Sequence, residues 1–212
     1  MEQWRIEKLQ LLDTYKEMNK SAQKGQTVFA GSSLMEMFPV EEWMKELGEA
    51  APVVYNRGVG GYTTEDYLPV LDICVLDLAP KKVFINIGTN DLNRPDMTID
   101  AIMANYEQMI FQIKQQNAAV KIYLMAYYPV NEVVATPEIK ECLKVRTNEK
   151  IAQANAAVQS LAQKHGLAFI DVTAPLKDAQ GRLKAEYTTE GMHIKPEGYR
   201  AIFPLVVPYV ME

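Results

Sequence analysis

The sequence predicts an α/β fold in which a parallel sheet is covered by helices on both faces. Five short apolar runs, at residues 27–30, 52–56, 82–87, 120–126 and 167–171, alternate with segments of helical periodicity. Each run is almost continuously apolar, which is typical of strands that are buried on both sides. Glycine or proline follows most of the runs, so we expect turns at the carboxyl ends of the strands, where ligands bind in folds of this kind.

An amphipathic helix is predicted at the N-terminus, over about residues 2–23. Lys and Glu separate apolar residues that recur mostly at helical spacing and are expected to face the domain. These residues are Trp4, Ile6, Leu9, Leu11, Leu12, Tyr15 and Met18. The first strand, residues 27–30, follows Gly25 and ends at the Gly-Ser-Ser turn of residues 31–33.

The next two strands are each followed by a predicted helix. The strand at residues 52–56 ends at a glycine-rich loop, and a helix over 64–78 begins at Thr64, with Glu65 and Asp66 in its first turn. The strand at 82–87 ends at a Gly-Thr-Asn-Asp turn and is followed by a helix over 99–116.

The C-terminal part repeats this alternation. After the strand at 120–126, helical periodicity predicts one long helix over 138–165, whose charged positions are expected to form a solvated face. Gly166 is suited to end that helix. The last strand, at 167–171, leads to a final helix over 196–210.

The composition is that of one globular domain, and we expect a single domain over residues 1–212. Of the 212 residues, 48% are hydrophobic and 23% charged, enough to bury a core without disulfides. No Pro/Gly/Ser-rich stretch or block of like charge divides the chain. The net charge is −5 and the basic residues are scattered, which argues against partners such as nucleic acid or an anionic membrane surface.

Cys74 and Cys142 are expected to be buried free thiols, because neither belongs to a cluster with metal-ligand spacing. We therefore predict no metal and no cofactor. The N-terminus alternates in charge, and no apolar run approaches the ~20 residues of a membrane span. These features predict a cytoplasmic protein without stable membrane insertion, or a secreted or periplasmic one if a signal peptide has been removed. Whether the chain forms a homo-oligomer stays open.

The strand-end loops and the C-terminus supply the groups that acyl transfer needs: a nucleophile, a base, an orienting group for the base, and donors for the oxyanion. Ser33 follows the first strand, where its hydroxyl can project over the sheet edge. Residues 34–38 are expected to begin a helix whose N-terminal amides face the same place. The turn alone is also compatible with an ordinary loop serine.

His193 is the candidate general base, since it is one of two histidines and lies in a loop before the last helix. Glu190, three residues earlier, is suited to orient the ring so that its other nitrogen faces Ser33. The alternative is a surface loop histidine. His165 ends a long predicted helix, where the helix dipole favours an imidazole, and we interpret it as structural.

Asn90 and Gly61 are the candidate oxyanion donors. The Asn90 amide lies just past a strand and stays uncharged, and glycine at residue 61 lets a backbone N–H approach the substrate closely. A turn-forming Asn is the alternative. A phosphate cradle at residues 58–64 is poorly supported, because the loop lacks the lysine of a P-loop and Thr63 breaks the dinucleotide-binding spacing.

Four segments, in this order, resemble the conserved blocks of the SGNH (GDSL) hydrolases. They are residues 29–33 (Phe-Ala-Gly-Ser-Ser), 56–63 (Asn-Arg-Gly-Val-Gly-Gly-Tyr-Thr), 88–91 (Gly-Thr-Asn-Asp) and 190–193 (Glu-Gly-Met-His). The resemblance spans about residues 27–200, and four motifs in order are much more specific than any one of them.

This resemblance implies a flavodoxin-like three-layer α/β/α domain with a five-stranded parallel sheet, and hydrolysis of an ester without a metal. Carried over to this chain, Ser33 is the nucleophile and His193 the base. The Ser33 N–H, the Gly61 N–H and the Asn90 side chain form the oxyanion hole.

Two residues depart from the usual pattern of the family. Ser32 stands where the family usually has Asp, as in its bacterial Gly-Ser-Ser branch. Glu190 stands where the family has the Asp of Asp-x-x-His, and it is one methylene longer. Either the backbone shifts to accommodate Glu190 in the triad or another group orients the base; Asp171 and Glu186 are nearby in sequence but lack the expected spacing.

The predicted function is a serine esterase that hydrolyses short acyl esters, above all O-acetyl esters on carbohydrates. No insertion between the four blocks supplies the apolar lid that long acyl chains require. Two alternatives stay open: a lipid esterase resembling lysophospholipases or platelet-activating-factor acetylhydrolases, and a non-catalytic carbohydrate-binding relative. The presence of Ser33, Asn90 and His193 together argues against the non-catalytic alternative.

Overall fold

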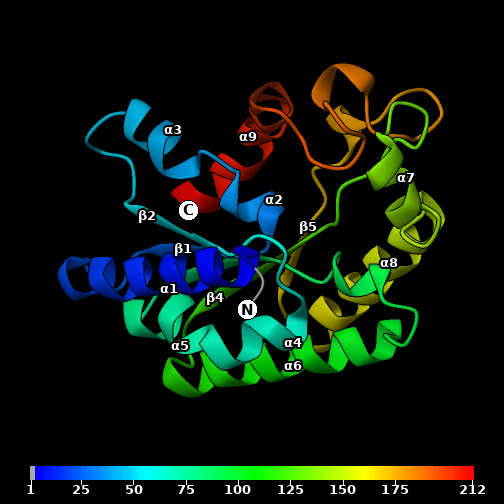
Figure 1. The fold of residues 1–212 in the computed structure, drawn as a ribbon. Helices are drawn as coiled ribbons and strands as arrows, with labels where there is room; N and C mark the ends of the chain where they lie inside the picture. Colours follow the sequence, from blue (N-terminus) through cyan, green and yellow to red (C-terminus); the bar gives the residue numbers. More distant parts are fainter. Residues whose placement is uncertain (1–2) are drawn as a thin grey trace.

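A computed structural model describes residues 3–212, and its centre is a five-stranded, all-parallel sheet (Figure 1). The strand order is β2-β1-β3-β4-β5. The strands are β1 (Thr27–Gly31), β2 (Val54–Gly58), β3 (Lys82–Asn86), β4 (Lys121–Met125) and β5 (Ala168–Ile170). The expected parallel α/β sheet is confirmed, and the strand order reverses direction between β1 and β3, the place where such folds bind ligands.

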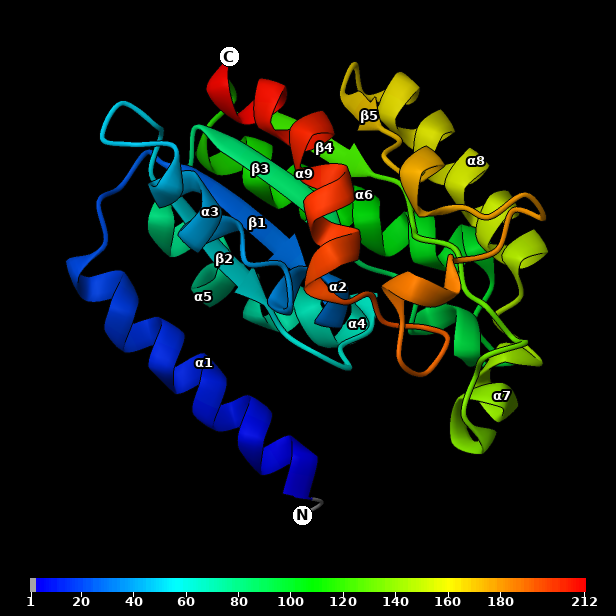
Figure 2. The same cartoon turned by 90° about the horizontal axis from the view of Figure 1, so that it is seen from above.

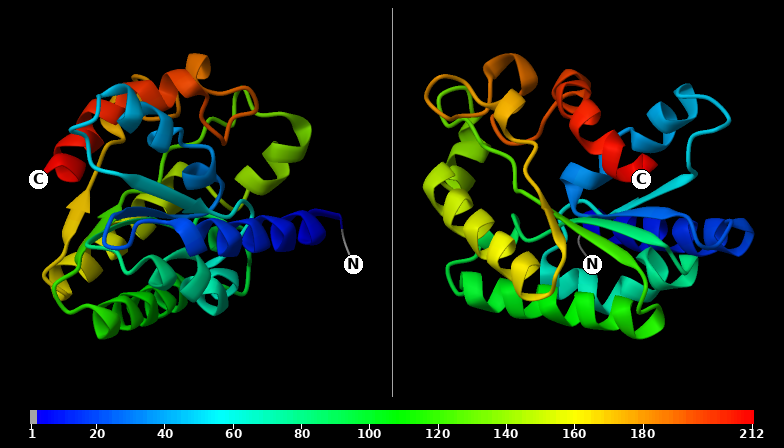
Figure 3. Two further views of the ribbon diagram at one scale, coloured as in Figure 1. Left: turned by 90° about the vertical axis from the view of Figure 1, so that its left-hand side faces the viewer. Right: turned by 180° about the vertical axis from the view of Figure 1, so that it is seen from behind.

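Helices cover both faces of the sheet, which gives three layers (Figure 1). One face carries α2 (Ser33–Glu36), α3 (Val40–Glu46) and α9 (Pro196–Met211). The other carries α1 (Gln3–Ser21), α4 (Thr64–Tyr67), α5 (Leu71–Cys74), α6 (Ile99–Gln116) and α8 (Asn148–Lys164), with α7 (Pro137–Leu143) just before α8. Figure 3 shows α6 and α8 side by side on this second face. Short 3₁₀ segments are Leu68–Val70, Leu76–Leu78, Asp91–Asn93, Ala174–Leu176 and Ala185–Tyr187.

Alternate residues of the strands enter opposite layers of the core. Phe29, Phe84 and Tyr123 lie opposite one another on β1, β3 and β4 and face the α9 layer. Their rings stack at centroid distances of 4.5 Å for each neighbouring pair. Val28 and Ile85 point into the other layer, as the two-residue period of a strand requires.

Two of the predicted helices are each broken in two. The segment 64–78 divides into α4 and α5 around Pro69, because proline has no N–H to donate within a helix. The segment 138–165 divides into α7 and α8, and Thr147 caps α8 by accepting the N–H of Lys150 at 3.1 Å. The expectation that its charged residues are solvated is wrong for Arg146, which lies in the break and is 3% exposed.

The N-terminal helix forms, but its buried face differs from the expected one. Leu12, Tyr15 and Asn19 are buried, and residue 2, the expected start of the helix, lies outside the described residues. The prediction that the apolar residues of this helix face the domain is wrong for three of them, which are exposed: Trp4, Leu9 and Met18. Helix α1 lies along the β2 side of the molecule (Figure 2), so only a narrow face of it meets the core.

The two cysteines are free thiols in different surroundings. Cys74 is buried, as expected, whereas Cys142 on α7 is half-buried. The expectation of burial is therefore wrong for Cys142, because α7 lies at the periphery of the fold (Figure 2).

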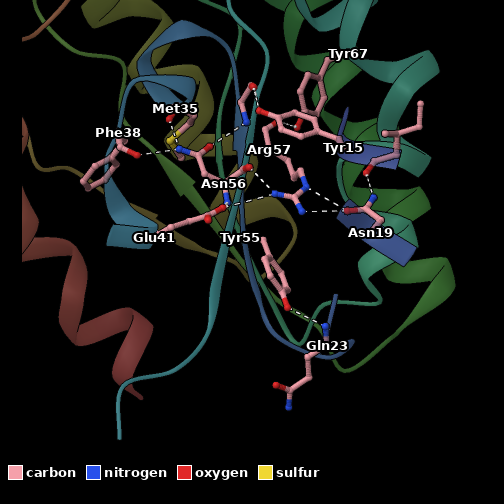
Figure 4. Close-up of polar contacts among 12 residues, drawn as sticks. Tyr15, Asn19, Gln23, Met35, Phe38, Glu41, Tyr55, Asn56, Arg57 and Tyr67 are labelled. Atoms are coloured by element: carbon pink, nitrogen blue, oxygen red, sulfur yellow. Dashed lines mark hydrogen bonds and ion pairs between the residues drawn. The ribbon is translucent and has the colours of Figure 1, made fainter. Parts of the chain in front are cut away.

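A buried arginine fastens α1 to β2 (Figure 4). Arg57 is 1% exposed and donates from Nε and Nη2 to Asn19 Oδ1, at 3.3 and 3.1 Å. Its guanidinium lies 4.8 Å from the Tyr15 ring centroid and 5.3 Å from that of Tyr55, within the range of cation–π attraction. The Tyr15 hydroxyl donates to the Gly58 carbonyl at 2.8 Å, so α1 holds the end of β2 where the glycine loop begins.

Glycines at the carboxyl ends of β1 and β2 let backbone segments approach closely, and at β2 the neighbour is the backbone of α2. A Cβ on Gly58 would lie 2.1 Å from the backbone N of Glu36, and a Cβ on Gly31 would lie 2.1 Å from the Asn86 carbonyl oxygen. Only glycine permits these approaches. The approach at Gly58 places α2 over the end of β2, and the approach at Gly31 is between β1 and β3.

We expect Gly58→Ala to lower the free energy of unfolding by about 1–3 kcal/mol or more, because the new methyl group would push against backbone that cannot move independently. Gly60→Ala is the control: there a Cβ would meet the ends of the flexible Glu36 and Lys8 side chains. Urea denaturation of both variants measures the difference. An equal loss in the two variants would contradict the tight packing at Gly58.

Candidate active site

Ser33 and His193 are separated by 160 residues in the chain and lie in hydrogen-bond contact. Ser33 begins α2 directly after β1, and its Oγ is 3.0 Å from His193 Nε2. His193 lies in the loop before α9, and Figure 2 shows the start of α9 close to α2 at the ends of the strands. The Tyr199 hydroxyl holds the two helices together by donating to the Leu34 carbonyl at 2.8 Å.

Glu190 contacts the other ring nitrogen of His193. Its Oε1 is 3.0 Å from His193 Nδ1 and also accepts the backbone N–H of His193. With Nδ1 donating to the carboxylate, Nε2 is free to accept the Ser33 hydroxyl proton. The longer glutamate side chain thus reaches the position, whereas Asp171 instead accepts the N–H of Thr173.

The histidine loop is held by a glycine in the left-handed conformation. Gly191 has φ +92°, and a Cβ on it would lie 2.5 Å from the Asn131 carbonyl oxygen. The Asn131 N–H donates to the Gly191 carbonyl at 2.7 Å, and Thr188 Oγ1 accepts the Gly191 N–H at 2.8 Å. These bonds fix the turn that separates Glu190 from His193.

The hydrogen bonds from His193 set the charge state of Glu190. Burial raises the pKa of the Glu190 carboxyl, but the side-chain and backbone hydrogen bonds of His193 act in the opposite direction and together prevail. The pKa of Glu190 therefore lies below its ordinary value of 4.5, and the residue is a carboxylate at neutral pH.

Two backbone N–H groups at the site have no acceptor among the described residues. The Ser33 N–H opens α2, so it has no partner within the helix, and the Gly61 N–H is also unbonded within residues 3–212. Gly61 has φ +80°, and a Cβ on it would meet nothing within 4 Å among those residues, so glycine is needed there for its conformation and not for space. Both groups are available to a ligand oxygen.

Asn90 supplies a third donor. Its Nδ2 donates one hydrogen to the Tyr62 carbonyl at 3.0 Å, which leaves the second hydrogen for a ligand. Its Oδ1 accepts from Nη1 of Arg146 at 3.4 Å. Hydrogen bonds thus hold both the oxygen and the nitrogen of the Asn90 amide.

Further hydrogen bonds join the loops that carry these donors. The buried Asp91 carboxylate accepts the backbone N–H of Thr64 at 3.0 Å, so the asparagine loop is tied to the start of α4. Burial raises the pKa of Asp91, although the Thr64 hydrogen bonds oppose the shift. On the other side, Glu36 of α2 accepts the Gly60 N–H and pairs with Lys8 of α1 at 3.1 Å.

The five candidate residues come together at the carboxyl ends of the strands. Ser33, His193 and Glu190 form one hydrogen-bonded chain, and the available donors of Gly61 and Asn90 lie on the two adjoining strand-end loops. Their roles in a reaction stay predictions.

Arg146 is a neighbour of the site that the sequence pattern does not reveal, because helical periodicity predicts one continuous helix through it. A signal for a new helix start is nevertheless present at that point. Thr147 is a favourable N-cap residue, and Asn-Glu-Lys follows it.

The arrangement can perform acyl transfer with the protein's own groups. Within residues 3–212, no three His, Cys, Asp or Glu side chains gather in a way that would hold a metal ion. A hydroxyl on a histidine that is oriented by a carboxylate, next to unbonded N–H donors, is the arrangement of a nucleophilic hydrolase.

Comparison with known proteins identifies the class. Residues 29–201 match the model of the GDSL-like Lipase/Acylhydrolase family, so the chain belongs to that family, whose members are carboxylic ester hydrolases. The five-stranded α/β/α architecture is that of the SGNH hydrolases.

Solved structures of similar fold span nearly all of the chain. A protein from Streptococcus pneumonia, described as a candidate platelet activating factor, is 32% identical with a TM-score of 0.84 and covers 96% of this chain and 92% of its own. A GDSL-like lipase from Bacteroides thetaiotaomicron is 23% identical, with a TM-score of 0.77 and coverages of 94% and 96%. An acetylxylan esterase from Geobacillus stearothermophilus is 15% identical, with a TM-score of 0.67 and coverages of 89% and 95%; these last two show the fold alone.

A curated relative is much longer than this chain. It is the N-acylneuraminate cytidylyltransferase of Escherichia coli O18:K1:H7, which is 27% identical over 150 residues. The match covers 70% of this chain but only 33% of the relative. The similarity therefore concerns about a third of that protein.

We expect Glu190 to stabilise the fold in a pH-dependent way. Because its pKa is lower in the folded state than its ordinary value of 4.5, its contribution is fully present above that value and is lost as the pH falls through the folded-state pKa. The free energy of unfolding of the wild type minus that of Glu190→Gln should therefore decrease as the pH is lowered from about 5.5 to about 3. Urea denaturation across this range measures it, and a difference that grows toward acid pH would contradict the assignment.

Proposed function

We propose that the chain is a serine esterase that hydrolyses short acyl esters through an acyl-enzyme on Ser33. The observation that carries this proposal is the continuous set of contacts from Ser33 Oγ through His193 to Glu190, with 3.0 Å at each step. The unbonded Ser33 and Gly61 N–H groups support it, because an oxyanion needs donors that are not otherwise engaged.

In the first half of the reaction, Ser33 attacks the ester carbonyl. His193 Nε2 takes the hydroxyl proton as the bond from Oγ to carbon forms, and Glu190 stabilises the resulting imidazolium. The carbonyl oxygen becomes an oxyanion that accepts hydrogen bonds from the Ser33 and Gly61 amides and from Asn90. The bond to the alcohol then breaks, and His193 returns the proton to the leaving oxygen.

In the second half, water hydrolyses the acyl-enzyme. His193 removes a proton from the water as its oxygen attacks the acyl carbon, and the same donors hold the second oxyanion. When the bond between the acyl carbon and Ser33 breaks, the serine oxygen takes the proton back from His193. The carboxylic acid leaves and the free enzyme is restored.

The surroundings of the glycine loop favour a carbohydrate as the alcohol half of the ester. A crevice of about 410 Å³ between α1 and α4 adjoins Tyr62, the neighbour of Gly61. Its lining combines aromatic residues with acidic and basic ones: Trp4, Tyr62, Glu65, Asp66, Arg5 and Lys8. Aromatic rings beside hydrogen-bond donors and acceptors are suited to a polyhydroxylated ring.

A lipid ester is the second candidate. The 32% identity to the pneumococcal protein described as a candidate platelet activating factor favours it. Among the helices of residues 3–212, none combines the length and the hydrophobicity that a membrane span requires.

A non-catalytic carbohydrate-binding protein is less favoured, because binding alone needs no serine in contact with a histidine–carboxylate pair.

We expect hydrolysis of p-nitrophenyl esters to fall from acetyl to octanoyl, and Ser33→Ala to abolish it, because the serine oxygen forms the acyl bond. Rates with each ester, beside the Ser33→Ala background, measure this. The same pair of proteins is then assayed on acetylated xylan and on platelet-activating factor. A maximum at the longer chains would favour the lipid substrate, and a wild-type rate equal to that of Ser33→Ala on every ester would contradict the esterase.

We expect Asn90→Ala to lower kcat by ~10²–10³, the effect typical of removing one oxyanion donor, with little change in KM. The reason is that the donor binds the transition state more strongly than the substrate. Steady-state kinetics on p-nitrophenyl acetate measure both constants. A change confined to KM would show that Asn90 binds the ground state and is not an oxyanion donor.

A further inference from the structure

Arg146 places a buried guanidinium beside the asparagine of the candidate oxyanion hole. It lies in the break between α7 and α8 and is 3% exposed. Its Nη1 donates to the Thr89 carbonyl at 3.3 Å and to Asn90 Oδ1 at 3.4 Å. The guanidinium thus contacts the backbone and the side chain of two successive residues in the asparagine loop.

The protein leaves this charge poorly compensated. Arg146 forms no ion pair with a carboxylate among residues 3–212, and its Nε is buried without a hydrogen-bond partner there. Burial lowers the pKa of Arg146 to about 10, although the charges of Cys142 and Glu190 oppose the shift, so the group remains a cation at neutral pH. Replacing a buried charge by an apolar side chain of similar size is often neutral for stability or stabilising.

The contact with Asn90 has a consequence for the orientation of the amide. A carboxamide can rotate by half a turn and exchange its oxygen and nitrogen, which would direct lone pairs toward a developing oxyanion. Arg146 offers only donors and the Tyr62 carbonyl only an acceptor. The two together permit one orientation, with Oδ1 toward Arg146 and Nδ2 toward Tyr62.

We propose that Arg146 is a positioning residue of the oxyanion hole, which holds the Asn90 amide with its second N–H available to the oxyanion. This inference rests on the proposed esterase function. This role also explains why the positive charge of Arg146 is only partly compensated within the fold. Negative charge develops next to Asn90 only in the transition state, and a fixed positive group nearby then becomes favourable.

The test is a double-mutant cycle on p-nitrophenyl acetate with Arg146→Met, Asn90→Ala and the double variant. Methionine keeps an unbranched, flexible side chain without the donors. We expect Arg146→Met alone to lower kcat by about 10- to 100-fold with KM nearly unchanged, because the amide loses its fixed orientation. In the Asn90→Ala background the same substitution should lower kcat by less than about threefold, because the group that Arg146 positions is absent.

Equal fold losses in the two backgrounds would overturn the proposal, because they would show that Arg146 acts independently of Asn90. Thermal unfolding gives a second criterion. We expect Arg146→Met to melt at the same temperature as the wild type or higher, since it removes a buried charge. A lower melting temperature with unchanged kcat would assign Arg146 a purely structural role and overturn the proposal as well.

Two further variants complete the design. Arg182→Met, on a loop where Arg182 bonds to Asp178 at 3.0 Å, changes the net charge equally and should leave kcat unchanged. If Arg146→Met does not fold, Arg146→Lys replaces it in the same cycle, because lysine keeps the charge but not the planar donor geometry. If the proposed esterase function is itself wrong, the result will be different: the wild-type rate will equal that of Ser33→Ala.

Discussion

The close approach between the backbone of α2 and the end of β2 is the constraint on which the site depends. Gly58 leaves no room for a Cβ against the backbone of Glu36. Because α2 begins at Ser33, this packing contact sets the height of Ser33 above the sheet and the loops that it faces. Glu36 extends the constraint by accepting the Gly60 N–H, so the helix that carries the serine also holds the glycine loop. The packing of α2 on the sheet therefore also positions the candidate nucleophile.

Two buried arginines show how the same residue type serves different purposes. Arg57 has Asn19 as an acceptor, two tyrosine rings against its faces and Glu41 at 3.6 Å, so its charge is compensated within the fold. Its role follows from these contacts: it fastens α1 to the strand before the glycine loop (Figure 4). Within residues 3–212, the guanidinium of Arg146 has only two hydrogen bonds, both long and both to the asparagine loop. The contacts within the fold explain the first arginine, whereas for the second we propose a role beside the oxyanion hole.

Strands and helices differ in how well their limits can be predicted. Four of the five strands lie within one residue of the limits that the apolar runs predict, because a nearly continuous apolar run records burial on both faces of a sheet. The exception is β2, which lies two residues beyond the predicted 52–56 and includes the first glycine of the expected loop. Helix α6 has the predicted limits, residues 99–116. The breaks at Pro69 and at residues 144–147 escape prediction, since hydrophobic periodicity averages over several turns and one irregular turn hardly changes it. The predicted buried face of α1 is also wrong in part, because a helix at the edge of a sheet meets the core through fewer residues than its apolar stripe contains.

The sequence by itself determined the fold class, the order of the strand-end loops and the residue types that they carry, because these depend on local patterns of burial and turn formation. Only the tertiary structure decided that Glu190 reaches His193 despite its extra methylene, that the Ser33 and Gly61 amides stay unbonded within residues 3–212, and that Arg146 contacts Asn90. The physical reason is that the site is assembled by contacts between residues far apart in the chain, 160 positions for Ser33 and His193 and 56 for Arg146 and Asn90. Their geometry depends on how closely helices pack on the sheet, to within a fraction of an ångström, and no local pattern in the chain records that distance.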